Sequence, residues 1–150
     1  MAAYNKFNIT AQDVFKGVHN ISTATVLKIK LSNTLPTATM NTSTEITEIS
    51  TGNGGYTAGG SAVAIASSIQ TSGTYILKAN AALVFTATSS NIGPFQYAVL
   101  YNSTAVTSST INGSSAPLLG WYDYGSAVTL AATETFTITW DATSGILQLA

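Results

Sequence analysis

His19 is the only histidine in the sequence and the first side chain to consider as a general base. A general base needs a nucleophile and an orienting acid close to it in space. Serines are abundant, but none stands in the Gly-x-Ser-x-Gly turn that marks a serine nucleophile. The string Gly17-Val18-His19-Asn20 is typical of a turn. We therefore expect His19 to make local hydrogen bonds rather than to catalyse a reaction.

Two glutamates, Glu45 and Glu48, are three residues apart and would share one face of a helical turn. A pair of carboxylates can hydrolyse a glycosidic bond. The simpler interpretation is negative charge at the start of a helix, where the helix dipole stabilises it. A glycosidase ranks last among our hypotheses, because catalytic carboxylates usually have charged partners that shift their pKa, and charges are scarce in this chain.

The remaining candidate ligands are acids that lie far apart in the sequence, namely Asp123, Glu134 and Asp141. Asp141 could bind calcium together with loop carbonyl groups. A lone acid in a turn is, however, typical of an Asx turn. The sequence therefore predicts no catalytic residue, no metal ligand and no cofactor-binding residue, and we expect that the protein is not an enzyme.

The glycine-rich segment from Gly52 to Gly60 invites comparison with phosphate-binding loops. In the motif Gly-x-Gly-x-x-Gly the third glycine would fall at Thr57, and no Lys-Ser or Lys-Thr pair follows the segment. We interpret it as an irregular loop that places Tyr56 against the body of the protein or against a neighbour.

Aromatic residues gather in two predicted strands, 95–102 and 118–124. Trp121 and Tyr122 are consecutive and must point to opposite faces of a strand, so only part of this cluster can be core. The outward part would form a protein contact or a platform for stacking on sugars, because Tyr and Trp bury a large area with few rotatable bonds. Our candidate contact residues are Tyr4, Phe7, Tyr56, Tyr97, Trp121, Tyr122 and Tyr124.

Charge is nearly absent from this chain of 150 residues. Charged residues make up 7% of it, arginine is missing, and Ser and Thr occupy about a quarter of the positions. Nucleic-acid affinity comes largely from Lys and Arg, and the five lysines are scattered, so we expect neither a nucleic-acid partner nor an anionic membrane. A net charge of -1 does little to oppose association, which favours a protein that works inside an assembly.

Alternating apolar and polar residues between turn signals predict a chain of short strands. In the clearest one, Leu27, Ile29 and Leu31 point one way, and Lys28 and Lys30 point the other. The expected strands are 25–31, 62–67, 73–79, 82–88, 95–102, 118–124, 127–130, 135–140 and 145–149. The pattern indicates an all-β fold, an antiparallel β-sandwich or jelly-roll-like single domain over residues 1–150.

Turns and helix signals complete this prediction. Gly125-Ser126 should break the chain between two strands, and the loop from Asp141 to Gly145 should join the last two strands as a hairpin. Pro94 and Pro117 should each stand just before a strand.

One or two short helical turns are expected. Thr10 would cap the first, and Ser43 or Thr44 would cap a second that buries Ile46 and Ile49 and ends at Gly52. Residues 1–20 are a candidate N-terminal arm, of which Ala2 to Phe7 would lie along a neighbour.

Several strings, taken as a set, resemble one family over nearly the whole chain. They are 4–7 (YNKF), 17–20 (GVHN), 31–34 (LSNT), 46–49 (ITEI), 52–54 (GNG), 56–60 (YTAGG), 92–95 (IGPF), 97–102 (YAVLYN) and 117–125 (PLLGWYDYG). The chain is similar in these strings to small structural proteins of tailed bacteriophages, the head decoration or cement proteins. It departs from that pattern at Gly54-Gly55, where a single glycine is expected before Tyr56.

The resemblance implies a virion protein made in the host cytoplasm and bound to the exterior of the head. Its expected partners are the major capsid protein and copies of itself, as a homotrimer on local three-fold axes. The family has no catalytic or cofactor residues to carry over. The alternative hypothesis is a tail- or fibre-associated β-sandwich that binds host surface glycans, with Trp121 and neighbouring tyrosines stacking on sugars and Asp123 bonding their hydroxyls.

Overall fold

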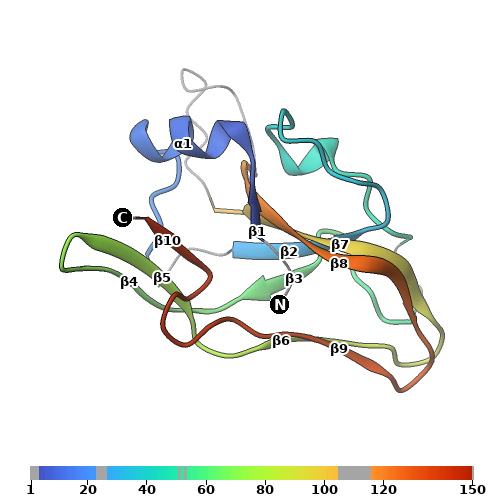
Figure 1. Cartoon of the computed structure of the whole chain (residues 1–150). Coiled ribbons are helices and arrows are strands. Elements are labelled where there is room, and N and C mark those ends of the chain that lie inside the picture. Colours follow the sequence, from blue (N-terminus) through green and yellow to red (C-terminus); the bar gives the residue numbers. More distant parts are fainter. Residues whose placement is uncertain (1–3, 23–26, 51, 53, 105–115, 150) are drawn as a thin grey trace.

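A computed structural model describes residues 4–22, 27–50, 52, 54–104 and 116–149 of the chain. These residues contain one α-helix, one short 3-10 helix and ten strands, joined by turns and loops (Figure 1). Their bounds are β1 Tyr4–Lys6, α1 Asn8–Phe15, β2 Leu27–Ser32, η1 Ser43–Glu45, β3 Ser61–Val63, β4 Ile65–Thr71, β5 Thr74–Ala79, β6 Leu83–Thr86, β7 Ile92–Asn102, β8 Leu118–Leu130, β9 Thr135–Ile138 and β10 Leu147–Leu149.

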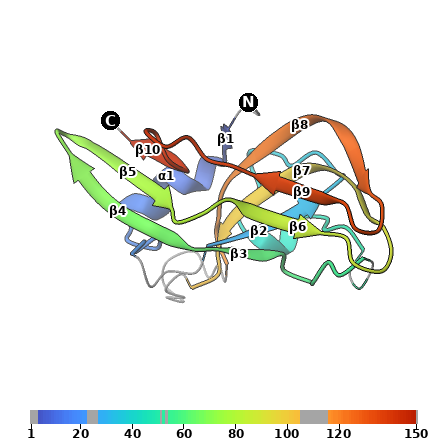
Figure 2. The same cartoon turned by 90° about the horizontal axis from the view of Figure 1, so that it is seen from below.

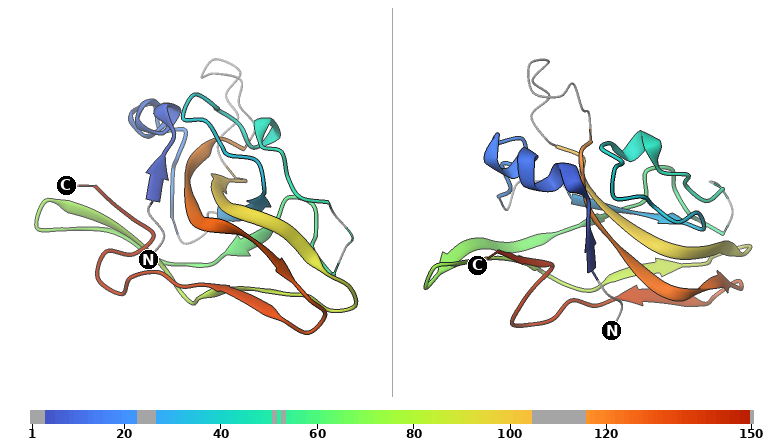
Figure 3. Two further views of the ribbon diagram at one scale, coloured as in Figure 1. Left: turned by 45° about the vertical axis from the view of Figure 1, so that its right-hand side comes forward. Right: turned by 45° about the horizontal axis from the view of Figure 1, so that its top comes forward.

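The strands form three antiparallel sheets, which confirms the predicted all-β fold class. The central sheet has the order β1-β8-β7-β2-β3, and its long pair β7–β8 spans its middle. A second layer lies against one face of this sheet and consists of the three-stranded sheet β10-β5-β4 and the ribbon β6-β9 (Figures 2 and 3). The described residues therefore form a sandwich whose second layer is divided in two.

The larger hydrophobic core fills the space between these layers, on what we call the sheet-covered face of the central sheet. Leu27, Ile29 and Leu31 of β2 enter it, as their alternation predicts, and are fully buried. The second layer contributes the other side of this core, where Leu77 of β5 and Phe85 of β6 are buried and Phe136 of β9 packs at its margin.

A second core lies on the opposite, helix-covered face of the central sheet. Its buried members are Phe7, Ile46, Tyr97, Val99, Tyr101, Leu118 and Trp121. Helix α1 and the segment around η1 lie over this face (Figures 1 and 3). The middle strands are consequently buried on both sides, which explains why five consecutive residues of β7 from Ala98 to Asn102 are all buried.

Irregularities in the β7–β8 pair decide which aromatic side chain enters which core. The register shifts between Phe95 and Tyr97 and again between Leu100 and Tyr101. Because one inserted residue reverses the side to which the following side chains point, Phe95 faces the sheet-covered core and Tyr97 faces the helix-covered one.

Strand boundaries differ from the predicted ones in informative places. Gly125 does not break the chain: it lies inside β8 with a φ of 91°, so one strand replaces the predicted 118–124 and 127–130. Pro94 also lies inside a strand, β7, at a register shift, whereas Pro117 directly precedes β8 as predicted. Residues 25 and 26 of the expected strand 25–31 lie outside the described residues.

The loop from Asp141 to Gly145 is a turn, but the prediction that it joins a hairpin is wrong. Strand β9 pairs with β6, whereas β10 pairs with β5. The chain therefore crosses after the turn from the ribbon to the three-stranded sheet, and Gly145 packs its backbone against the carbonyl of Leu77, where a Cβ would not fit.

Both helical segments exist with different starts. Phe7 is the residue that precedes α1, and Thr10, the predicted cap, lies inside the helix and donates to the Leu119 carbonyl oxygen at 2.8 Å. The second segment is the single turn η1, preceded by Thr42 and ending at Glu45 rather than at Gly52. Ile46 and Ile49 after it are buried, as predicted.

The candidate arm is part of the body from Tyr4 onward. Strand β1 pairs antiparallel with β8, with Tyr4 opposite Tyr122. The Tyr4 ring lies directly against Gly120, where a Cβ would collide with it. The next residue after β1, Phe7, is fully buried. Residues 4–7 thus lie along β8 of their own chain, and Ala2 and Ala3 lie outside the described residues.

Candidate binding groove

A groove of about 530 Å³ lies at one end of the sheet-covered face. It lies between β8 and β7 of the central sheet and the stretch of chain that runs from β9 to β10. Residues that line it are Tyr4, Phe95, Gln96, Ala98, Tyr122, Tyr124, Phe136 to Asp141 and Ser144 to Gln148.

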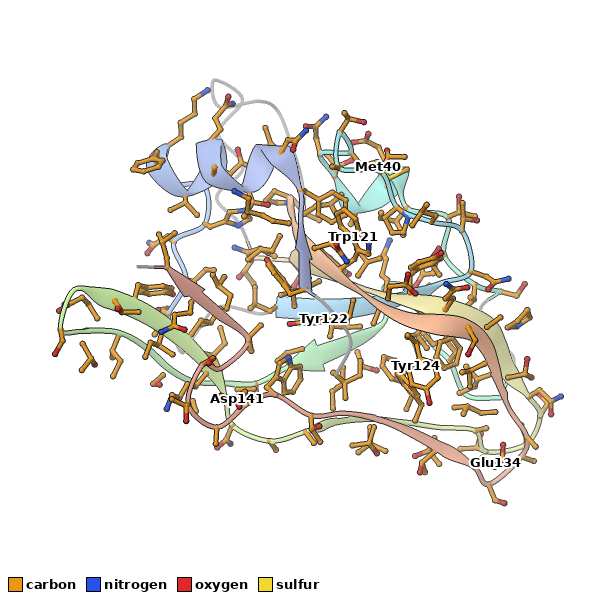
Figure 4. All side chains as sticks on the ribbon, viewed as in Figure 1. Met40, Trp121, Tyr122, Tyr124, Glu134 and Asp141 are labelled. Atoms are coloured by element: carbon orange, nitrogen blue, oxygen red, sulfur yellow. The ribbon has the colours of Figure 1, made fainter. Side chains whose placement is uncertain are left out.

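Aromatic rings form much of its wall. Tyr122 and Tyr124 are two residues apart on β8, so both point toward the second layer (Figure 4). The Tyr122 ring centroid is 5.5 Å from that of Tyr4, and the Tyr124 centroid is 5.6 Å from that of Phe136, edge to face. These contacts hold the rings in place while 56% of the Tyr124 side chain stays exposed.

Polar contacts connect the two sides of the groove. The Tyr122 hydroxyl donates to the Ile146 carbonyl oxygen at 3.2 Å. Burial raises the pKa of Tyr122 to about 12, an effect that the neighbouring Trp140 indole N–H partly offsets, so this hydroxyl stays protonated. The Trp140 indole N–H itself makes no hydrogen bond of good geometry with a described residue.

Two carboxylates near the groove are held by local hydrogen bonds. Asp141 Oδ1 accepts from the backbone N–H groups of Thr143 at 2.8 Å and Ser144 at 2.6 Å, which is the Asx turn predicted for this residue and lowers its pKa. Asp123 Oδ1 accepts from Gln96 Nε2 at 2.9 Å and from the Gly125 N–H at 2.7 Å. Both carboxylates therefore already accept local hydrogen bonds, Asp141 within the turn that follows β9 and Asp123 within β8 and from β7.

The seven candidate contact residues separate into two groups. Phe7, Tyr56, Tyr97 and Trp121 are buried within the chain, at 8% exposure or less, and offer no surface to a partner in this structure. Trp121 packs against Phe7 with ring centroids 4.6 Å apart. The other three, Tyr4, Tyr122 and Tyr124, are the ones that the structure brings together, and all three line the groove.

Tyr56 shows what the glycine-rich loop does. Its hydroxyl accepts from the Leu31 N–H at 3.0 Å and donates to Glu48 Oε1 at 2.8 Å. Leu31 lies on β2 beyond the end of its pairing with β3, and its carbonyl oxygen accepts from the Ile49 N–H at 3.0 Å, so Tyr56 completes the cover of this strand edge by pairing the Leu31 N–H. Of the two interpretations of this loop, the structure confirms the one that places Tyr56 against the body of the protein.

Glu45 and Glu48 do not form a pair. Glu45 Oε1 accepts from the N–H groups of Asn41 and Thr42, each at 2.9 Å, at the start of η1. Glu48 lies beyond η1 and is 3.6 Å from the ammonium group of Lys30, which also donates to the Ser43 carbonyl oxygen at 3.0 Å. Lys30, expected on a solvent-facing side of its strand, is buried under this segment.

His19 is buried rather than placed in an open turn. Its Nε2 is 4.0 Å from Asp13 Oδ2, and neither imidazole nitrogen makes a hydrogen bond of good geometry with a described residue. Burial lowers the pKa of His19 to about 4 and raises that of Asp13. The local bonds expected for this residue come from its backbone: its N–H and that of Val18 donate to the Asp13 carbonyl oxygen.

Neither a metal cluster nor a membrane span emerges from the described parts of the chain. No three His, Cys, Asp or Glu side chains among them lie close enough together to hold a metal ion. No helix among them has the length and apolar character needed to cross a bilayer.

Sequence reasoning missed two kinds of residue. Phe136 and Trp140 line the groove, and the alternation of 135–140 indicated their common face without indicating what they would face. Phe15, at the end of α1, is 89% exposed, and Val14 beside it is 41% exposed. The sequence of this eight-residue helix, whose last turn carries no basic residue, did not indicate that Val14 and Phe15 would be exposed.

Comparison of the chain with known protein families, with characterised proteins and with solved structures found no match.

Proposed function

We propose that this chain is a structural protein of a bacteriophage virion, a decoration or cement protein that binds the outside of the major capsid shell and stabilises it. The resemblance of its sequence strings to that family is what points to phage heads. The molecule's own features support a protein whose task is contact, and they are independent of that resemblance.

The observation that carries the proposal is the exposure of Phe15. A phenylalanine with 89% of its side chain in solvent contributes apolar area that folding does not use. Val14 and Phe15 together form a small apolar projection at the end of α1. Aromatic side chains on a surface often anchor protein interfaces, and here the scarcity of charge leaves such contacts as the main source of affinity.

Sheet edges support self-association, the second part of the proposal. Strands β4 and β10 are the two edges of the three-stranded sheet, and neither contains a charged residue or a proline. Natural proteins usually protect free edges with such residues. Ile69 on β4 and Leu149 on β10 are each 54% exposed, so copies of the chain could meet through these strands in a homotrimer.

The test is attachment of the purified protein to heads that lack it. Phe15→Ser should reduce occupancy on heads at least tenfold, because about 1.4 kcal/mol of lost contact energy already has that effect. Val84→Ser is the matched control, since Val84 is 48% exposed on β6, in the layer on the other side of the central sheet from α1. Equal occupancy of the two variants would contradict this use of Phe15.

Location on the virion is tested separately, by measuring the protein in purified heads and purified tails. Presence on tails with absence from heads would end the proposal of a decoration protein. Attachment should change little between low and high salt, because few charges are available for salt to screen. A steep loss of occupancy with sodium chloride would contradict the proposed neutral contacts.

A tail- or fibre-associated protein that binds host glycans is the second proposal. Trp121 cannot supply the stacking platform, because it is buried against Phe7. The aromatic groove favours this alternative instead, and its ligand can be argued from the lining side chains.

A further inference from the structure

We infer that the groove lined by Tyr122, Tyr124 and Trp140 is a binding site for a neutral carbohydrate chain. The inference goes beyond the proposed decoration role, and it deepens the second proposal, whose glycan site it places in this groove. It rests on the size of the groove, its rings, its polar groups and its charge.

Size and shape come first. A volume of about 530 Å³ lies within the range of about 300 to 1,000 Å³ that is typical of small-ligand sites. Such sites combine an apolar and aromatic lining with a few placed polar groups. Two sugar residues or more fit a groove of this size, and its open side lets a longer chain continue into solvent.

Ring faces supply the apolar part of the contact. Tyr124 is 56% exposed, and Tyr122 and Trp140 are half-buried, so parts of their rings remain accessible from the groove. The edge-to-face contact of Tyr124 with Phe136 and the bond from Tyr122 to Ile146 fix these rings before a ligand arrives. Binding then needs little ordering of side chains, which favours affinity.

Polar side chains on the same lining argue for a ligand with many hydroxyl groups. Thr137 and Thr139 alternate with the inward Phe136, Ile138 and Trp140, so their hydroxyls point away from the rings. The lining still includes the polar side chains of Gln96 and Ser144 and the hydroxyls of Tyr122 and Tyr124. An apolar peptide or a lipid chain seated here would cover some of these groups without pairing them, at a cost in free energy. A sugar pairs with such groups through its hydroxyls and presents its C–H faces to the aromatic rings.

Charge decides between the remaining ligand classes. No lysine among the described residues lines the groove. The ammonium group of Lys78, at the turn beside it, already donates to the Ala142 carbonyl oxygen at 2.8 Å and interacts with Asp141, so it is not an unengaged counter-charge for a phosphate or carboxylate ligand. Asp141 is the one acid in the described lining, and two backbone N–H groups already bond its Oδ1 and lower its pKa. A cationic ligand would therefore compete with an existing arrangement, whereas a neutral saccharide needs no charged partner.

The experiment uses the two tryptophans as paired reporters. Trp140 lines the groove and Trp121 is buried in the other core, on the far face of the central sheet. Trp121→Phe and Trp140→Phe assign their indole N–H signals in a ¹H–¹⁵N NMR spectrum. The full chain is then titrated with maltohexaose, cellohexaose, xylohexaose and chitohexaose, each to several times a Kd of about 1 mM.

Binding of at least one hexasaccharide should shift the Trp140 indole signal and leave that of Trp121 in place. Tyr124→Ser should weaken this binding about tenfold, as expected for the loss of one aromatic stacking contact. Leu35→Ser is the matched control, because Leu35 is exposed to nearly the same extent, 58%, but lies in the loop after β2, outside the groove. This control should bind as the unchanged protein does.

Three outcomes would overturn the inference. The first is that none of the four saccharides shifts the Trp140 signal. The second is that Tyr124→Ser and Leu35→Ser weaken binding equally, which would place the sugar elsewhere. The third is that tetramethylammonium or an apolar peptide shifts the Trp140 signal while the sugars do not. None of these results bears on attachment to heads, so failure here and failure of the proposed virion role remain distinguishable.

Discussion

The two faces of the central sheet are covered in different ways. Helix α1 and the segment around η1 cover one face and are bonded to the sheet, as in the contacts from Thr10 to Leu119 and from Lys30 to Ser43. Two small sheets cover the other face, and their strands pair with one another rather than with the central sheet. The groove lies at the end of this second cover, where the chain crosses from β9 to β10.

This difference teaches where the molecule can accommodate a ligand. A cover attached by directional bonds leaves little freedom, because each bond fixes a distance between the sheet and the segment above it. A cover held mainly by apolar packing fills the space only as far as its side chains reach. At the crossing between β9 and β10 the contact with the central sheet is local, through Ile146 and its bond from Tyr122, and a groove with accessible aromatic rings remains beside it.

The largest expected effect concerns the loop that closes the edge of β2. Gly60 has a φ of 71°, and a Cβ there would collide with the Ile29 carbonyl group. Gly60→Ala should lower the free energy of unfolding by about 5 kcal/mol, because the backbone of β2 or the loop must move. Urea unfolding measures this loss.

Gly73→Ala is the control for that substitution. Gly73 in the β4–β5 turn has a similar φ of 88°, but a Cβ added there would meet no described atom within 4 Å. Only the left-handed conformation is penalised there, so about 1 kcal/mol should be lost. Equal losses in the two variants would show that loop closure against β2 contributes nothing.

A second comparison uses one aromatic residue from each face. Trp121→Ala removes a buried ring from the helix-covered core and should cost about 4 kcal/mol. Tyr124→Ala removes a half-exposed ring from the groove and should cost about 1 kcal/mol. Thermal unfolding of both variants tests the ranking, and a larger loss for Tyr124→Ala would mean that the groove is a structural element rather than a site.

Acid should weaken the helix-covered face through His19. Its pKa in the folded chain, about 4, lies below the ordinary value of 6.5, so protons bind more tightly to the unfolded chain. The contribution to stability is complete above pH 6.5 and is lost as the pH falls toward 4. The shift corresponds to about 3 kcal/mol. Asp13, whose pKa is raised, opposes this trend in part.

The measurement is urea unfolding at pH 7 and at pH 4.5 for the unchanged chain and for His19→Gln. The unchanged chain should lose more stability between these pH values than the variant does. Other carboxylates, such as Asp141 with its lowered pKa, are present in both proteins and cancel in the comparison. An equal loss in the two proteins would exclude His19 as the group that responds to acid.

Alternation of side chains was enough to predict the fold class and the inward face of β2, because period two is intrinsic to a strand. It could not predict the second core. Lys30 belongs to the polar side of that alternation, yet the chain between Ser43 and Gly60 returns to cover it, a long-range contact with no local signal. The aromatic cluster was divided between faces by the bulges of β7 and β8, which depend on pairing between distant strands.

The groove could not be predicted from the sequence for the same reason. Tyr122 and Tyr124 were identified as candidates, but their partners Phe136 and Trp140 come from a segment that local patterns pair wrongly with the last strand. A turn such as Asp141 to Gly145 fixes a reversal of direction and not which sheet the next strand joins. Local chemistry therefore predicted the turn, and long-range pairing decided the site.

The smallest expected effect is the difference in stability loss between removing the Tyr56 hydroxyl and removing the Tyr122 hydroxyl. Tyr56→Phe leaves the Leu31 N–H and Glu48 without their shared partner beneath the loop and should cost about 2 kcal/mol. Tyr122→Phe removes one longer bond to Ile146 beside the groove, where water can replace the hydroxyl, and should cost less than about 1 kcal/mol. Urea unfolding of the two variants gives both values. If Tyr122→Phe lowers the free energy of unfolding more than Tyr56→Phe does, the bond to Ile146 holds the crossing from β9 to β10 in place. The cover of the sheet-covered face would then depend on directional hydrogen bonds as much as the cover of the helix-covered face does.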